Sequence, residues 1–181
     1  MKLRPTLLLL LLPIGLAACA AEPPAAATGA APPASAPARA AGDSARPLLI
    51  VHKTPWCGCC SAWAEQAEAA GFAVELRDTE DLNPIKRALG VPTAQASCHT
   101  AEVDGYFVEG HVPFEDVRRL LAERPAARGI AVPGMPAGSP GMESDTPQRY
   151  RVNLVAADGS VSEYAVHNAE AERTAHGHHD H

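Results

Sequence analysis

Basic side chains are scarce in this chain of 181 residues, and so are aromatic ones. Fifteen Lys and Arg stand against 21 Asp and Glu, for a formal net charge of −6, and Phe, Trp and Tyr together make up 4% of the residues. The sequence contains no basic patch of the kind that binds a phosphate backbone. Nucleic acid is therefore excluded as an expected partner. The acidic balance fits solubility and the attraction of cations.

A hydrophobic run long enough to cross a bilayer is also missing near the N-terminus. The apolar run at residues 7–16 follows two basic residues but is too short to span. It ends in Leu16-Ala17-Ala18-Cys19, which resembles a bacterial lipobox. We expect residues 1–18 to be a lipoprotein signal peptide and Cys19 to be acylated, so that a lipid anchor alone holds the protein to the membrane. The alternative is an ordinary signal peptide with an incidental cysteine.

Large apolar side chains are absent from the next segment, residues 20–46. Eighteen of its 27 residues are Ala or Pro, and it contains no aromatic or large aliphatic residue. Such a stretch cannot bury enough apolar surface to fold. We therefore predict an acylated Cys19 with a disordered linker over 19–46, one folded domain over 47–168, and a disordered His-rich tail over 169–181. The lipobox places the mature protein in the periplasm, and Ala20 after the cysteine is typical of sorting to the outer membrane.

The folded part predicts alternating strands and helices in an α/β order. Hydrophobic pattern and cap residues indicate a strand at 48–51, helix 61–70, strand 72–76, helix 84–89, a hairpin of 100–103 with 106–108, and helix 114–123. This order, with a dithiol motif after the first strand, is that of a thioredoxin-like core. Residues 126–143 predict an irregular surface loop, because Pro and Gly are frequent there. Residues 150–156 and 161–166 flank Asp158-Gly159 and predict an appended C-terminal β-hairpin.

Four consecutive residues, Cys57-Gly58-Cys59-Cys60, carry the most specific chemical signal. They precede a predicted helix, whose N-terminus favours thiolates and lowers thiol pKa values. Cys57 and Cys60 have the spacing of a redox dithiol, and Cys59 is surplus to it. Cys59 and Cys60 point about 100° apart on a helix, which suits a single tetrahedral zinc poorly. Thiolates that bridge more than one closely spaced Cu(I) ion would fit the crowding better.

Cys98 supplies a fourth thiol. Aligning the hairpin with that of a glutaredoxin-like fold places Cys98-His99 opposite the motif, where such folds carry a cis-proline. Pro92 is a rival for the cis-proline position. The alternative for all four thiols is two structural disulfides, which an oxidising compartment permits.

Several further residues qualify as weaker metal ligands. His99 and His111 lie beside the predicted site segments, and His52 precedes the motif. Met135 and Met142 offer thioether sulfur, which suits Cu(I), although methionine more often fills gaps in a core. The histidines of the tail could capture Cu(II) at the surface or be merely solvated.

The chain resembles the CopG-type envelope copper-resistance proteins, a metal-binding family with a CxCC motif. The matching residues are 52–60, 90–92, 97–100, 103–106, 109–113, 132–136 and 138–143. The resemblance runs from about residue 48 to 166 and leaves out the lipobox and the tail. It implies a thioredoxin-like fold, copper bound by the motif thiols and Cys98, and a role in copper tolerance.

Two functions of different classes stay open. The first is a periplasmic protein that holds Cu(I), more than one ion, and acts in copper resistance by sequestration or by Cu(I)/Cu(II) conversion, in exchange with other copper-handling proteins. The second is a thiol–disulfide oxidoreductase that uses Cys57 and Cys60. Whether the protein is an enzyme, either a copper or a thiol oxidoreductase, does not follow from the residues.

Overall fold

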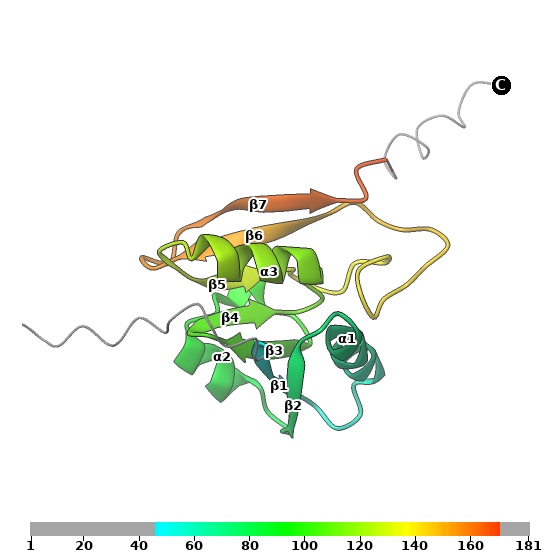
Figure 1. Ribbon diagram of the computed structural model, residues 1–181, viewed down its shortest axis with the longest axis horizontal. Helices are drawn as coiled ribbons and strands as arrows, with labels where there is room; N and C mark the ends of the chain where they lie inside the picture. The colour runs from blue at the N-terminus through cyan, green and yellow to red at the C-terminus, as the bar shows by residue number, and fades with distance from the viewer. Residues whose placement is uncertain (1–45, 171–181) are drawn as a thin grey trace, which may run out of the picture. The chain divides into compact units, whose positions relative to one another are not determined.

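A mixed seven-stranded sheet runs through the computed structural model, which describes residues 46–170 (Figure 1). The strands are β1 (Leu48–Lys53), β2 (Ala73–Asp78), β3 (His99–Val103), β4 (Tyr106–Glu109), β5 (Ala127–Ala131), β6 (Tyr150–Ala156) and β7 (Val161–His167). The helices of this part of the chain are α1 (Gly58–Ala69), α2 (Asn83–Leu89) and α3 (Phe114–Glu123), with a short 3₁₀ turn at Thr93–Gln95. The mixed α/β class agrees with the sequence prediction.

The strand order is β2-β1-β3-β4-β5-β6-β7, so β2 and β7 form the two edges (Figure 1). β1 pairs in parallel with β2 and antiparallel with β3, and β3 pairs antiparallel with β4. β1 lies inside the sheet, and its residues from Leu49 onward are largely buried. The segment that carries the cysteine motif therefore leaves the sheet from an interior strand next to the β2 edge.

Two hydrophobic clusters lie on opposite faces of the sheet. The larger cluster joins α1 and α3 to the sheet, with Trp63 and Leu120 among its fully buried members. Phe107 belongs to the smaller cluster, whereas its neighbour Val108 belongs to the larger one. Successive strand residues point to opposite faces, so the two clusters are separated by the sheet. The predicted apolar face of the last helix is largely correct, since Phe114, Val117 and Leu120 are buried.

The prediction of an irregular loop over residues 126–143 is wrong in its first part. Residues 127–131 form β5, which pairs in parallel with β4 and antiparallel with β6. Gly129 was one of the residues that indicated a loop, but it serves a close approach of two strands. A Cβ added there would lie 2.1 Å from the Phe107 carbonyl oxygen. From residue 132 to 149 the chain has no regular helix or strand.

β5 also joins the last two strands to the rest of the sheet. β6 pairs with β5, and β7 pairs antiparallel with β6 across the turn at Asp158-Gly159. α3 packs against β7, where the Arg119 guanidinium lies 3.6 Å from the centre of the Tyr164 ring. The C-terminal strands therefore extend the sheet and share its core.

The signal peptide predicted at 1–18, the acylation of Cys19, the linker up to residue 45 and the tail from residue 171 lie outside the described residues. Within residues 46–170, no helix has the length and the apolar character that a membrane span requires.

Because β4 and β5 approach each other closely at Gly129, we expect its replacement by alanine to destabilise the fold strongly. Gly129→Ala would force the backbones of β4 and β5 apart, and we expect it to lower the free energy of unfolding by on the order of 3 kcal/mol. Gly159→Ala is the control, because Gly159 has φ +87° but no atom within 4 Å of an added Cβ. It should cost about 1 kcal/mol. Urea unfolding of both variants would contradict this explanation if Gly129→Ala cost no more than the control.

Candidate metal site

The motif lies at the N-terminus of α1, as the sequence predicts. The Cys57 amide donates to the Thr54 carbonyl at 3.1 Å, and Cys57 is the N-cap residue with extended backbone. No acidic residue lies in the first turn of α1. The positive end of the helix dipole therefore acts on the cysteines without a competing carboxylate.

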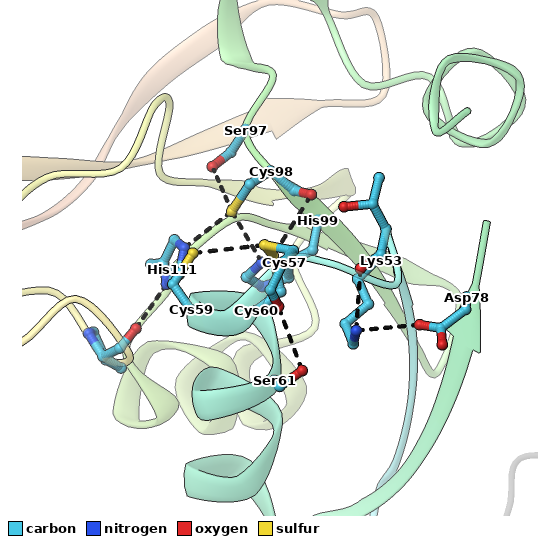
Figure 2. The surroundings of a disulfide bond; sticks show 12 residues. Lys53, Cys57, Cys59, Cys60, Ser61, Asp78, Ser97, Cys98, His99 and His111 are labelled. Atoms are coloured by element: carbon cyan, nitrogen blue, oxygen red, sulfur yellow. Dashed lines mark hydrogen bonds and ion pairs between the residues drawn. A yellow bond between two sulfur atoms is a disulfide. The ribbon is translucent and has the colours of Figure 1, made fainter. Parts of the chain in front are cut away.

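Cys57 and Cys60 form a disulfide bond, and Cys59 and Cys98 are the free cysteines of the described chain (Figure 2). Cys59 Sγ lies 3.6 Å from Cys57 Sγ. The arrangement differs from the alternative of two structural disulfides, because only one bridge is formed. The bridge joins the two thiols whose spacing is that of a redox dithiol.

Cys98 directly precedes β3 and faces the motif. Cys60 Sγ lies 3.7 Å from the Cys98 carbonyl oxygen, and the sulfur atoms of Cys57, Cys59, Cys60 and Cys98 all lie within 4.8 Å of one another. The structure thus brings together the four thiols that the sequence proposed. No peptide bond between residues 46 and 170 is cis, whether at Pro92 or before His99.

Two buried histidines extend the cluster on the side of Cys98 (Figure 2). His111 Nε2 lies 3.0 Å and His99 Nδ1 lies 3.5 Å from Cys98 Sγ. His111 Nδ1 lies 2.8 Å from the Pro140 carbonyl oxygen, which can only accept a hydrogen bond. His111 Nδ1 therefore carries the proton, and the lone pair of Nε2 faces Cys98.

Burial determines the protonation of these groups. It lowers the pKa of His99 well below its ordinary value, with further lowering by the nearby His111 and Lys86, and it also lowers the pKa of His111. Burial, with a second contribution from the neighbouring Cys59, raises the pKa of Cys98 to about 11. Both imidazoles are therefore neutral and able to donate a lone pair. A cation bound by Cys98 has to displace its proton.

The donor set fits a soft cation. The four sulfur atoms form one group, and Cys98 belongs to a second group with the two neutral imidazoles. His99 Nε2 is buried without a hydrogen-bond partner. Thiolate and imidazole ligands together favour Cu(I) or zinc over the hard cations that prefer oxygen. The residues present can therefore hold a thiophilic metal.

The three weaker candidates differ in their surroundings. His52 Nε2 contacts Glu102 Oε1 of β3 at 2.7 Å. The Met135 side chain is 52% exposed, and Met142 lies in the irregular segment, where its backbone is hydrogen-bonded to Gly138 and Ser139. His52 is in neither of the two groups of His, Cys, Asp and Glu side chains that could share one metal ion.

The segment after β5 closes against the motif, which sequence reasoning missed. Gly141 packs on the first turn of α1, where an added Cβ would lie 2.7 Å from the Cys59 carbonyl oxygen. Glu143 Oε1 accepts hydrogen bonds from the Gly141 amide and from Gln66 Nε2, both at 2.8 Å. Frequent Pro and Gly indicated only an irregular loop. That the loop positions His111 through Pro140 depends on the tertiary structure.

Comparison with known proteins yields two solved structures that are similar to this chain. Both are described as copper resistance protein CopG, in two forms. One has a TM-score of 0.65 and 44% identity over 67% of this chain and 98% of its own, and the other has a TM-score of 0.64 and 45% identity over 66% and 96%. A family model described as "Protein of unknown function, DUF411" matches residues 95–142, which include Cys98 and His111. No curated protein matches the chain.

The close contact at Gly141 predicts that Gly141→Ala detaches the loop from α1. We expect faster cleavage after Glu143 by a glutamate-specific protease, together with a lower melting temperature. Gly134→Ala is the matched control: its φ of +71° is close to the +77° of Gly141, but nothing lies within 4 Å of the added Cβ. Both variants carry the backbone strain of about 1 kcal/mol. Equal cleavage rates would contradict a specific role of the contact.

The lowered histidine pKa values predict a loss of stability in acid. The unfolded chain binds protons near the ordinary pKa of 6.5, above the folded pKa of His99 and His111. Stability is therefore fully present above about pH 6.5 and falls below it, by up to about 1.4 kcal/mol per pH unit for each histidine. Urea unfolding of the metal-free protein at about pH 7.5 and 5.5 should show a smaller decrease for His111→Gln than for the wild type.

Proposed function

The chain belongs to the CopG family of copper resistance proteins, and on this premise we propose that it binds Cu(I) through clustered cysteine sulfurs. The observation that carries the proposal is the approach of four Sγ atoms to within 4.8 Å of one another, although Cys98 is 38 residues from Cys60. Soft thiolate donors favour Cu(I) among the metals of the cell envelope.

The proposed ligands are Cys57, Cys59, Cys60 and Cys98, with His99 and His111 as nitrogen donors. Thiolate sulfur bridges neighbouring Cu(I) ions readily, so we propose more than one ion. The two neutral imidazoles beside Cys98 support a site that is extended in that direction. His52, Met135 and Met142 are secondary, since His52 is in neither group of possible ligands and the two methionines offer only thioether sulfur.

Copper binding requires the Cys57–Cys60 bridge to be opened first. A dithiol reductant of the thioredoxin class would supply two electrons and two protons, which yields two thiols here and a disulfide in the reductant. The thiols then lose their protons as Cu(I) binds. The metal-free dithiol can close again by exchange with a disulfide oxidant, which takes up the two electrons and two protons and is reduced to a dithiol.

The core from β1 to α3 is proposed to be thioredoxin-like, with β6 and β7 as an appended hairpin. The order β2-β1-β3-β4, the parallel pairing of β1 with β2 and the dithiol at the start of α1 support this assignment. The motif cysteines Cys57 and Cys59 are partly exposed. A partner could therefore reach them to exchange copper.

The proposed role is copper resistance in the periplasm, by sequestration of Cu(I) or by Cu(I)/Cu(II) conversion, in exchange with other copper-handling proteins. The lipobox at residues 16–19 supports a lipid anchor on Cys19, and Ala20 supports the outer membrane. The anchor, the linker over 19–46, the domain over 47–168 and the tail over 169–181 remain predictions of the sequence.

A second candidate function is thiol–disulfide exchange by Cys57 and Cys60. The disulfide between these two residues, at the N-terminus of a helix, is the observation that favours it. In that function Cys59 and Cys98 would be dispensable.

The surplus thiol distinguishes the two functions. Reduced wild-type protein should take up more than one equivalent of Cu(I), and Cys59→Ser should lower the copper-to-protein ratio, because a bridging sulfur is lost. Ser61→Ala is the control, since it changes the same helical turn without removing a thiol. The ratio is measured by elemental analysis after gel filtration. If Cys59→Ser keeps full disulfide reductase activity and the wild type retains no copper, the second function replaces the first.

A further inference from the structure

A buried ion pair lies behind Cys98 and has no place among the proposed ligands. It joins Lys86 Nζ on α2 to Glu109 Oε1 on β4, and Glu109 is fully buried. Charges are costly to bury, and a pair of apolar residues of similar volume often stabilises a protein as well. The other contacts of Lys86 and Glu109 therefore have to explain why a charged pair is buried here.

The carboxylate of Glu109 holds the Cys98 segment on both sides. Oε1 accepts a hydrogen bond from the Ser97 amide at 2.6 Å, and Oε2 accepts one from the Thr100 hydroxyl at 2.6 Å. Ser97 and Thr100 directly flank Cys98-His99. Lys86 Nζ also donates to Thr100 Oγ1 at 3.0 Å. Hydrogen bonds to the Glu109 side chain therefore hold the chain on both sides of the ligand candidates Cys98 and His99.

The same end of β4 carries the histidine that contacts Cys98. Glu109 is followed by Gly110, whose amide donates to the His99 carbonyl at 3.0 Å, and then by His111. Gly110 has φ +72°, and an added Cβ would lie 2.5 Å from Ser97 Oγ. The hydrogen bond from Ser97 to Glu109 therefore ties the Cys98 segment to the strand end from which His111 projects.

We propose that Glu109, held and neutralised by Lys86, is a positioning residue that places Cys98 against His111 and the motif. The inference rests on the proposed copper site for its purpose, but the placement of Cys98 can be measured without metal. Glu109 itself is not a ligand, because its oxygens face Ser97, Thr100 and Lys86.

Two double variants separate positioning from stability. Lys86→Met with Glu109→Gln removes both charges and keeps an oxygen for the Ser97 amide and an NH₂ for the Thr100 hydroxyl. Lys86→Met with Glu109→Leu removes both charges and all hydrogen bonding. Neither leaves a lone buried charge, so both are expected to fold. Thr100→Val is a third variant, which removes one fastening and keeps the ion pair.

The first measurement is alkylation of Cys98 by iodoacetamide in the metal-free, disulfide-bridged protein, resolved from other cysteines by peptide mapping. We expect the Leu double variant to raise the Cys98 rate about tenfold, the Gln double variant to stay near the wild type, and Thr100→Val to lie between. Ser61→Ala is the control, because the hydroxyl that it removes contacts the Cys57 carbonyl and not the Cys98 segment, so the Cys98 rate should not change. Equal Cys98 rates in the Gln and Leu variants overturn the proposal.

The second measurement is Cu(I) affinity of the reduced proteins by competition with bicinchoninate. The Leu double variant should bind Cu(I) about tenfold more weakly than the wild type, as is typical when a hydrogen-bond partner behind a metal ligand is lost. The Gln double variant should have an affinity near that of the wild type. Equal Cu(I) affinities of the Gln and Leu double variants would overturn the role of Glu109 in the copper site. Absence of copper binding by the wild type refutes the proposed function, whereas the alkylation contrast still tests the placement of Cys98. If the Leu variant fails to fold, an unchanged Cys98 rate in Thr100→Val overturns the proposal.

Discussion

The contact of Cys98 with the cysteine motif is the interaction on which the proposed chemistry depends. Cys57, Cys59 and Cys60 are neighbours in sequence and would crowd together on any helix that begins there. Cys98 is separated from them by β2 and α2, and it arrives only because β3 pairs with β1, the strand that leads into the motif. The antiparallel pairing of β1 with β3 therefore turns a local dithiol into a cluster of four sulfurs.

Buried polar groups surround this contact, and they impose opposite requirements on the site. His99 and His111 are kept neutral by burial, which prepares them as ligands and costs stability in acid. The Cys98 thiol is held protonated by the same burial. A metal ion that replaces the Cys98 proton compensates the cost of burying the thiolate charge, so metal binding and stability are expected to be coupled. The Cys57–Cys60 bridge satisfies two of the thiols when metal is absent.

Much of the fold follows from local patterns in the sequence. The strands and helices up to residue 123 appear where apolar periodicity and cap residues predict them, because those signals lie within a few adjacent residues. β5 was missed, since Gly129 in a short apolar run looks the same in a loop and in a strand that passes close to another backbone. The difference lies in the neighbour, Phe107, which is 22 residues away.

The sequence by itself determined the dithiol motif, its place at the start of a helix, the candidate ligands and the family resemblance, because each is encoded in contiguous residues. The tertiary structure decided which candidates meet. It gathered His99 and His111 around Cys98 and directed His52 toward Glu102 instead. It also placed the buried carboxylate of Glu109 behind the site, a role for which the spacing of residues carries no signal. Such contacts depend on strand register and loop packing, which arise only when distant segments share one core.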